Sequence, residues 1–375
     1  MDSLKMDYRV VPRRAVTTTS HDCLRRKCPF YGTTCFVHGA RRFAETADVV
    51  VTNHTLLFCD AAADNGLLPP VRHWILDEAH GAEAEARRAF SLEIAAEDVT
   101  RLAQKVASGE NRNVYARAER KLSSSLKNDG ATLFEGLIGK AKSAGDMFAA
   151  AAHEFAPHIK DLLYFDPNKR SRSYDRTELW LNDDIRASET FGSLRTLAKA
   201  MQASAEKAIT CSQELVGYLE NIEGAAEPQR EIASVAMDLK DLVGAVEVIF
   251  GEKSDSYAYA AELCRKKDKQ TDKLEALVVN VGEALEDKLY SQTKSVVFAS
   301  ATLSIDGDFT SFENAMGLNA GEDTRARTCQ LDSSYDFDKN MTVYVANDIP
   351  EPSDPHYLEA LERLLVGTHI AQQGS

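Results

Sequence analysis

The sequence predicts an α/β protein in which a parallel sheet is interrupted by a large, mainly helical insertion. Short apolar runs typical of buried strands occur before residue 80 and again near residue 295, and long Ala-, Glu- and Lys-rich stretches with few Gly or Pro lie between them. A chain of 375 residues is long enough for two or three domains. It has no apolar run of the ~20 residues that span a bilayer. Its first residues also lack the apolar core of a signal peptide, so a cytoplasmic location without a membrane partner is expected.

Two strands are expected before residue 80. Residues 49–52, within ADVVVTNHTLLF, have the pattern of a buried strand that runs into a turn at Asn53 and His54. A proline-broken connection leads to a second apolar strand at residues 74–76. Apolar strands flanked by helical patterns favour a parallel sheet, because such a sheet is covered on both faces.

The insertion is expected to be an antiparallel helical domain, with a dimeric coiled coil as the alternative. Residues 225–228, which end in a proline, separate its two most regular helices. A polar interruption at residues 166–184 is expected to be an excursion or a hairpin. The first helix repeats apolar residues every seven positions and the second every three or four: Leu194, Met201, Ala208, Leu215 and Ile222, then Ile232, Val235, Leu239, Leu242, Val246 and Ile249.

Strand patterns return at residues 274–281 and 295–303, with a short helix expected at 282–290 between them. This order predicts that the β-α-β alternation resumes, as if the helical domain were inserted into a single sheet.

The strand at 74–76 ends on Asp77 and Glu78, a pairing typical of nucleotide hydrolysis. Ligands of open α/β sheets bind at the carboxyl ends of the strands. Asp77 is therefore expected to hold Mg²⁺, and Glu78 to orient and deprotonate the attacking water. Ser300 and Thr302 end the later strand, where their hydroxyls are placed to reach Glu78 or His80.

The phosphate-binding loop that such a site needs, G-x-x-x-x-G-K-[ST], does not occur in these 375 residues. GLIGKAKS (136–143) and GEKS (251–254) lack its glycine spacing and its Gly-Lys-Ser/Thr ending. The sequence therefore predicts that this chain alone neither binds ATP tightly nor hydrolyses it.

The N-terminal segment differs from the rest in charge and in cysteine content. The chain as a whole has a net charge of −14, but residues 1–45 carry nine Lys/Arg against four Asp/Glu, so a contact with a polyanion is expected there. Cys23, Cys28 and Cys35 stand as C-x₄-C-x₆-C. An iron–sulfur cluster usually takes four cysteines, and the next one, Cys59, lies beyond the expected strand. A Cys₃His zinc site with His38 and three unligated thiols are the alternatives.

Basic and aromatic side chains surround these cysteines, a combination suited to single-stranded nucleic acid. The basic residues are Arg25, Arg26, Lys27, Arg41 and Arg42, and the aromatic residues are Phe30, Tyr31 and Phe36.

Taken in order, C-x₄-C-x₆-C, ARRFAETADVVVTNHTLL, WILDEAH, the helical insertion and VVFASATL resemble the DinG/XPD-type superfamily 2 DNA helicases, and bacterial DinG most closely. The resemblance implies a RecA-like first motor domain and a helical Arch domain that fills the 220 positions between His80 and Ser300. It implies ATP-driven 5′→3′ translocation on single-stranded DNA and unwinding of duplexes, forks or R-loops. Cys23, Cys28 and Cys35 would then bind a [4Fe-4S] cluster.

The resemblance also implies site roles and a domain order. Asp77 and Glu78 would bind ATP and Mg²⁺. His80, Ser300 and Thr302 would couple hydrolysis to DNA. DNA would be contacted by Asn53 and His54 together with Arg25, Arg26, Arg41 and Arg42. The expected domains are a cysteine module (1–45), first motor domain (46–83), Arch (84–250), return to the first motor domain (251–330) and start of the second (331–375).

The family places a fourth cluster cysteine and the phosphate-binding loop upstream of these motifs. The chain is therefore expected to be the central part of a helicase, monomeric, inactive as an ATPase by itself and with an absent or labile cluster. The alternative is a standalone DNA- or protein-binding module without motor activity, whose cysteine site is zinc-stabilised or empty.

Overall fold

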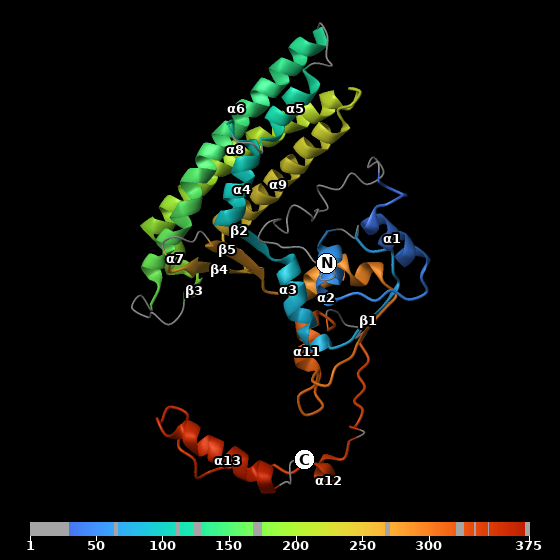
Figure 1. Ribbon diagram of the computed structural model, residues 1–375, viewed down its shortest axis with the longest axis vertical. Helices are drawn as coiled ribbons and strands as arrows, with labels where there is room; N and C mark the ends of the chain where they lie inside the picture. Colours follow the sequence, from blue (N-terminus) through green and yellow to red (C-terminus); the bar gives the residue numbers. More distant parts are fainter. Residues whose placement is uncertain are drawn as a thin grey trace. The chain divides into compact units, whose positions relative to one another are not determined.

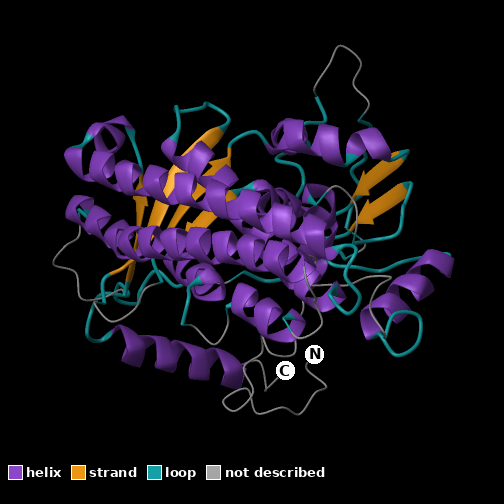
Figure 2. Cartoon of the chain, turned by 90° about the horizontal axis from the view of Figure 1, so that it is seen from above, coloured by secondary structure: helices purple, strands orange, loops and turns teal. Residues whose placement is uncertain are grey.

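A computed structural model describes residues 30–63, 67–109, 113–123, 129–167, 175–266, 271–319, 326–333, 335–343 and 345–371. The chain divides into two compact units, Met1–Ala326 and Arg327–Ser375. The first unit contains two sheets with different strand directions, a two-stranded parallel sheet and a four-stranded antiparallel sheet. Figure 2 shows their strands as two separate groups.

The parallel sheet consists of β1 (His73–Leu76) and β6 (Ser295–Phe298), paired in the register Trp74↔Val296 and Leu76↔Phe298. The strands expected at 74–76 and 295–303 are thus confirmed, but the second ends at Phe298, so the Ser-Ala-Thr segment is a loop. One face of the sheet packs on a small core. On the other face, Ile75 and Val297 are exposed.

The strand expected at residues 49–52 is wrong. The described residues 47–53 contain no strand, and Val49 and Val51 are 78% and 92% exposed. A strand obtains its backbone hydrogen bonds only from a neighbouring strand. β1 and β6 pair with each other, and residues 49–52 join neither of them. The apolar run indicated the residue types that suit a strand but not the neighbour that a strand requires.

The antiparallel sheet has the order β2 (Leu92–Ala95), β5 (Lys273–Val278), β4 (Tyr257–Cys264), β3 (Arg176–Trp180). The strand expected at 274–281 exists as β5, but the expectation that it resumes the parallel sheet is wrong. The connection between β4 and β5 is too short for the crossover of a dozen or more residues that parallel neighbours need, so the two strands pair antiparallel. The polar stretch at 166–184 contributes β3, which pairs with β4.

Long helices pack side by side above this antiparallel sheet (Figure 1). The two apolar patterns expected for the insertion are confirmed, because all their members are buried in or packed against one large core. Pro228 stands in the first turn of its helix, where a missing backbone N–H costs nothing. The bundle helices are α4 (Ala96–Val106), α5 (Val114–Leu122), α6 (Asp129–His158), α8 (Glu189–Leu219) and α9 (Ala226–Phe250). Short elements η4 (Ile159–Phe165) and α7 (Asp183–Ala187) connect them to the sheet.

A second, smaller core lies beside the parallel sheet. Its helices are α2 (His54–Ala62), α3 (Ala82–Phe90), α10 (Val281–Lys288) and α11 (Thr310–Met316), with short η5 (Tyr290–Gln292). The helix expected at 282–290 is confirmed by α10 and η5. A backbone contact fixes α10 on α11: a Cβ added at Gly282 would lie 2.3 Å from the Cα of Gly317. Preceding these elements, α1 (Phe36–Thr46) has no buried residue.

The second unit, Arg327–Ser375, contains α12 (Phe337–Asn340) and α13 (Tyr357–Ala371) among its described residues. The hydroxyl of Tyr335 donates to the carbonyl of Asn340, 3.1 Å away, across the first helix. Leu358 and Ile370 on α13 are about three-quarters exposed. Among the described helices of both units, none combines the length and apolarity that crossing a bilayer requires.

Candidate functional site

Two loops meet at the carboxyl end of the parallel sheet. The first, residues 77–81, follows β1 and contains η3 (Ala79–Gly81); the second, residues 299–304, follows β6. Backbone hydrogen bonds extend the pairing beyond the strands. The N–H of Ala299 donates to the carbonyl of Leu76 at 2.9 Å, and the N–H of Ala79 donates to the carbonyl of Ala299 at 3.0 Å. These bonds hold the two loops side by side.

Glu78 has a left-handed backbone conformation, with φ 50° and ψ 43°. This region is unfavourable for a residue with a Cβ, and residues held in it are found preferentially at functional sites. The N–H of Glu78 donates to Oδ1 of Asp77 at 3.0 Å, which helps to hold the turn. The Glu78 side chain is 72% exposed. The turn therefore presents the carboxylate to solvent beyond the strand end.

His80 connects the two loops. Its Nδ1 lies 3.0 Å from Oγ of Ser300 and 3.3 Å from Oε2 of Glu78. The sequence placed the hydroxyls of the second loop near Glu78 or His80, and Ser300 is found there. Thr302 is exposed and contacts this group through its backbone N–H, 3.5 Å from Ser300 Oγ.

Two carboxylates, those of Asp77 and Glu78, stand at this end of the sheet. Both are exposed, and they lie at the end where α/β sheets bind ligands. Carboxylate oxygens are the protein ligands that Mg²⁺ prefers, and the ion keeps several waters when only one or two of them bind it. An accessible carboxylate is also the group that accepts a proton from an attacking water.

Asn53 and His54 lie at the start of α2. The side-chain oxygen of Asn53 accepts the N–H of Leu56 at 2.9 Å, so this residue caps the helix. The His54 ring lies 6.4 Å from that of Phe58 and is half-buried. Thr55 donates to Glu85 at 2.7 Å and thereby joins α2 to α3. Capping of α2 is therefore sufficient to explain the asparagine at position 53.

Of the cysteines expected to bind a cluster, Cys35 is described, and Cys23 and Cys28 lie outside the described residues, as do Arg25 and Arg26. Cys35 is the N-cap of α1, where its sulfur accepts the N–H of His38 at 3.4 Å. The His38 ring stacks on Tyr31 with the ring centroids 3.6 Å apart. Within the described part of the chain, no three His, Cys, Asp or Glu side chains gather as a metal site.

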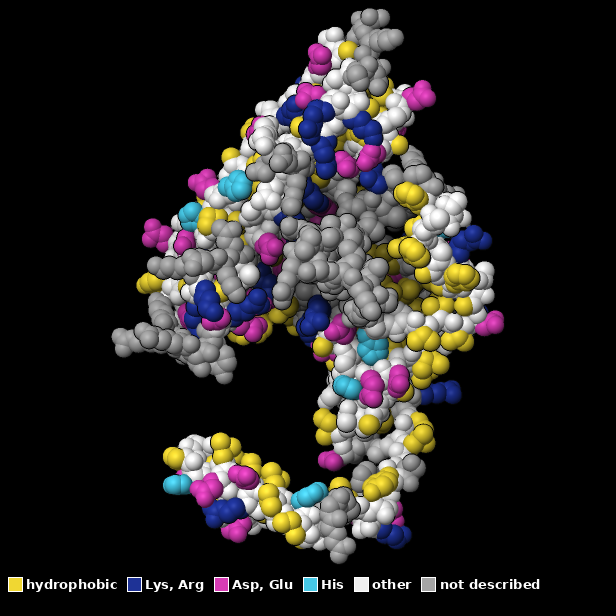
Figure 3. All heavy atoms as spheres, in the orientation of Figure 1, with side chains coloured by type: hydrophobic (Ala, Val, Ile, Leu, Met, Phe, Trp, Pro, Cys, Tyr) yellow, Lys and Arg dark blue, Asp and Glu magenta, His cyan; other side chains and the backbone are white. Residues whose placement is uncertain are grey.

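Helix α1 carries an exposed aromatic stripe formed by Phe36, which was expected from the sequence, and Phe43, which was not. Phe36 and Phe43 are 93% and 78% exposed, and their spacing of seven places them on one helix face. Arg42 follows on the flank of that face, whereas Arg41 lies toward the opposite side of the helix. Figure 3 shows hydrophobic side chains on the side of the molecule where Figure 1 places α1. The spacing of Phe43 from Phe36 was the signal that could have revealed it.

Comparison with known proteins identifies the relatives of this chain. No family model matches it. It is 26% identical over 344 residues to the 3′-5′ exonuclease DinG of Bacillus subtilis (strain 168), covering 88% of this chain and 35% of that protein. It is 28% identical over 338 residues to the ATP-dependent helicase DinG of Mycobacterium tuberculosis (strain ATCC 25618 / H37Rv), covering 90% and 42%.

A third relative is the ATP-dependent DNA helicase YoaA of Escherichia coli (strain K12), 23% identical over 354 residues, which cover 93% of this chain and 46% of that protein. The chain thus spans less than half the length of each of these relatives. Similarity that runs along about nine-tenths of its residues identifies the chain as a homologue of the DinG-type helicases.

Proposed function

We propose that this chain is the central part of an ATP-dependent 5′→3′ DNA helicase, which translocates on single-stranded DNA and unwinds duplexes, forks or R-loops. The observation that carries the proposal is the meeting of His80 with Ser300 beside Glu78 at the carboxyl end of a parallel strand pair. The names of two relatives, ATP-dependent helicase and ATP-dependent DNA helicase, agree with it.

In this proposal each residue of the site has a separate task. ATP with its Mg²⁺ supplies the phosphoryl group that a water attacks. Asp77 contributes an oxygen ligand to the ion, and the Glu78 carboxylate orients that water and accepts its proton. His80 and Ser300 join the loop that bears Glu78 to the loop after β6, so when one loop moves, the other moves with it. Thr302 extends the second loop toward DNA.

The helical bundle and its sheet correspond, in the same proposal, to an Arch domain inserted into the first motor domain. Because β4 and β5 lie in the sheet of the bundle, the proposed insertion runs from β2 to β5 instead of ending at residue 250, and the other expected domain limits are kept. A cytoplasmic location and a monomeric state are also part of the proposal. The cysteine module is retained as the place of a [4Fe-4S] cluster. Cys35 is the described cysteine of this module, and its sulfur accepts the N–H of His38.

Single-stranded DNA is proposed to bind along α1. Bases stack on Phe36 and Phe43, while Arg41 and Arg42 contact phosphates. Arg42 is exposed and Arg41 is partly exposed on this helix.

The hydrolytic part of the proposal is tested by measuring phosphate release from ATP and Mg²⁺, with and without single-stranded DNA. For the 375-residue chain, no turnover above that of Glu78→Gln is expected, because the sequence contains no phosphate-binding loop. DNA-stimulated turnover that disappears in Glu78→Gln would contradict the predicted inactivity.

The DNA-binding part is tested by fluorescence anisotropy with a labelled oligothymidine at several salt concentrations. Phe36→Ala and Phe43→Ala should each weaken binding about 5- to 150-fold, since stacking contributes about 1–3 kcal/mol per base. Arg41→Ala and Arg42→Ala should each reduce the salt dependence by about one phosphate contact. Arg101→Ala, which removes the same charge from the bundle, is the matched control. Equal affinity in all five variants would exclude α1 as the DNA interface.

A further inference from the structure

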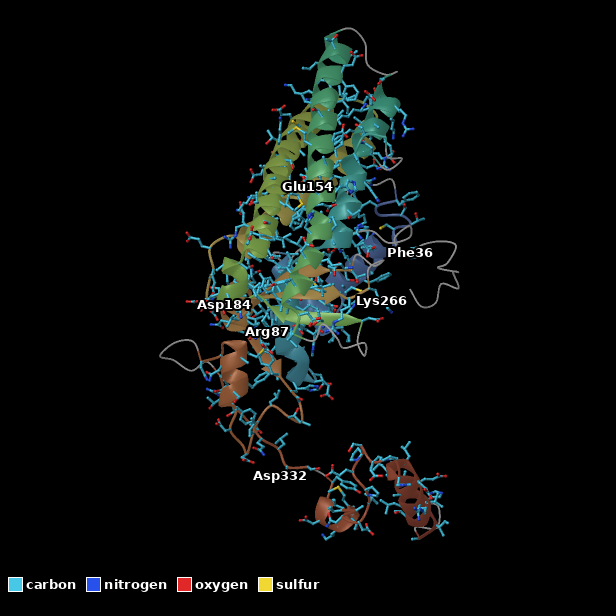
Figure 4. The ribbon with its side chains drawn as sticks, turned by 90° about the vertical axis from the view of Figure 1, so that its left-hand side faces the viewer. Phe36, Arg87, Glu154, Asp184, Lys266 and Asp332 are labelled. Carbon is cyan, nitrogen blue, oxygen red and sulfur yellow. The ribbon has the colours of Figure 1, made fainter. Side chains whose placement is uncertain are left out.

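The chain crosses twice between the two cores, and both crossings lie beside one side chain, Arg87. The chain leaves the small core at Ser91, directly after α3, and enters β2. It returns at the end of β5, through Val278 and Val279, and continues into α10. Strands β2 and β5 are neighbours in the antiparallel sheet. The two crossings therefore form a two-stranded stalk at the foot of the bundle, where Figure 4 labels Arg87.

Arg87 binds both crossings simultaneously. Its guanidinium donates from Nη1 to the carbonyl of Val278 and, at 3.1 Å, to that of Val279. Its own carbonyl accepts the N–H of Ser91 at 3.0 Å and the hydroxyl of Ser91 at 2.6 Å. The Ser91 hydroxyl in turn accepts the N–H of Val278 at 3.2 Å. Backbone and side chain of Arg87 thus form a closed ring of hydrogen bonds between α3, the outgoing crossing and the returning crossing.

The guanidinium is held in this position by a carboxylate on its own helix. Nε of Arg87 donates to Oε1 of Glu83 at 3.0 Å, and Nη2 donates to the same oxygen. The two side chains are 34% and 31% exposed. A planar guanidinium can satisfy a carboxylate with one edge and carbonyls with another, which the compact ammonium of lysine cannot do. Arg88, the next residue, is 78% exposed and pairs only with Glu85 among the described ion pairs.

Each chain segment that Arg87 touches is connected along the chain to one loop of the candidate site. Helix α3 begins at Ala82, two residues after His80, and its opposite face, Ala82 and Ala86, is fully buried. The returning crossing leads through α10 to β6 and Ser300. The backbone contact between Gly282 and Gly317 prevents α10 from shifting independently. These connections provide a route by which a tilt of the stalk would reach both loops.

We propose that Arg87 is a positioning residue that couples the helical insertion to the geometry of the Glu78–His80–Ser300 site. The role of this coupling in hydrolysis rests on the proposed function. The mechanical connection between the insertion and the two loops does not. Movement of the bundle, when it engages a partner, would alter the alignment of the two site loops through the Arg87 joint.

The test is hydrogen exchange of the 375-residue chain without nucleotide or DNA, read at single residues by fragmentation mass spectrometry. The decisive amides are those of Ala79 and Ala299, which bridge the two site loops and do not contact Arg87. In Arg87→Ala they should exchange about fivefold faster than in the parent chain, because the joint no longer holds α3 to the returning crossing. Arg87→Lys should fall between the two. Arg88→Ala, the matched control, should leave both amides unchanged.

If Arg87→Ala accelerates exchange only near Ser91 and Val278, Arg87 is a local brace and the proposal is wrong. If Arg87→Ala does not fold, Glu83→Gln provides the test. It retains the arginine and removes the carboxylate that orients it, so a smaller acceleration at Ala79 and Ala299 is expected, and none would overturn the proposal. Because no DNA is present, failure of the chain to bind DNA would refute the proposed function without affecting this result.

Discussion

His80 and Ser300 lie with Nδ1 and Oγ 3.0 Å apart, although 220 positions of sequence separate them. A second histidine–serine pair joins the same two strands at their other end, where Nδ1 of His73 lies 2.8 Å from Oγ of Ser295. His73 and Ser295 are register partners within the ladder, whereas His80 and Ser300 lie in the loops beyond it. The first pair thus belongs to the sheet, and the second connects two loops that the sheet brings together.

This difference leads to a prediction for Ser300→Ala. Removing the hydroxyl should speed amide exchange at Ala301 and Thr302, because the Thr302 N–H and the His80 ring both lose their contact with Ser300. Global stability should change by less than about 1 kcal/mol, since the pair is largely exposed. Ser295→Ala, at the opposite strand end, is the control and should not affect the loop. Equal amide exchange at Ala301 and Thr302 in both variants would show that the His80–Ser300 contact does not hold the loop after β6.

The contact of Gly282 with Gly317 gives a second prediction. Gly282→Ala should destabilise the small core by about 1–3 kcal/mol, because the new Cβ would meet backbone atoms that cannot yield. Gly317→Ala should do the same, with the added cost of φ +70° for a residue with a Cβ. The chain has two tryptophans, and in a Trp180→Phe background only Trp74, on β1, reports urea unfolding.

The control for this pair is Gly244→Ala in α9, where an added Cβ meets nothing within 4 Å. It should leave the Trp74 transition unchanged, because α9 belongs to the bundle core. A Gly282→Ala transition identical to that of Gly244→Ala would mean that α10 and α11 can separate at little cost.

Sequence patterns predicted those parts of the fold that depend on local spacing. The apolar repeats that include Leu194 and Ile232 are enough to place two helices against a core, because a helix face is decided by residues three or four apart. The meeting of Glu78, His80 and Ser300 followed from a general rule that strand ends of α/β sheets share one edge. The roles of these residues in hydrolysis remain predictions.

What the sequence could not provide are pairings between distant segments. Residues 49–52 have strand composition without a strand beside them, and β5 pairs with β2 and β4 instead of β1. Strand preference reflects the surroundings as much as the residue itself. Arg87 illustrates the same limit, because its contacts with Val278 and Val279 span more than 190 positions and follow no motif.

A third prediction concerns Arg186, which lies at the foot of the bundle. It is 7% exposed and donates to the carbonyls of Ile249 and Gly251, at 2.9 and 3.1 Å, at the end of α9. The rings of Phe191 and Tyr259 lie 5.2 and 4.4 Å from its guanidinium carbon. Burial lowers the pKa of Arg186, but the group stays charged and satisfies the carbonyls that end the helix.

Arg186→Ala should therefore destabilise the bundle by about 2–4 kcal/mol, through lost charge-assisted hydrogen bonds and lost packing on the rings. Arg186→Lys should recover only part of this, since one ammonium cannot reach both carbonyls and stack as well. The measurement is urea unfolding in a Trp74→Phe background, in which Trp180 reports the antiparallel sheet. An Arg186→Lys variant as stable as the parent would show that charge alone suffices at this position.

Tyr115 and Ser212, both fully buried, give a pH-dependent prediction. Their hydroxyl oxygens lie 2.8 Å apart, and burial raises the pKa of Tyr115 from 10.0 to about 12, although the hydrogen bond with Ser212 lowers it. In the unfolded chain the tyrosine ionises near pH 10, so unfolding is favoured above that pH until the folded-state pKa is passed. The free energy of unfolding should thus fall by roughly 1–3 kcal/mol between pH 10 and 12 because of this group.

Tyr115→Phe should be less stable by about 1 kcal/mol at pH 7, where Ser212 loses its partner, and this difference should shrink or reverse above pH 10. Tyr164→Phe, at a 69% exposed tyrosine, is the control for loss of a tyrosine hydroxyl and should change the stability at pH 7 by less than about 0.5 kcal/mol. A constant difference between Tyr115→Phe and the parent across pH 7–12 would show that Tyr115 ionises alike in both states.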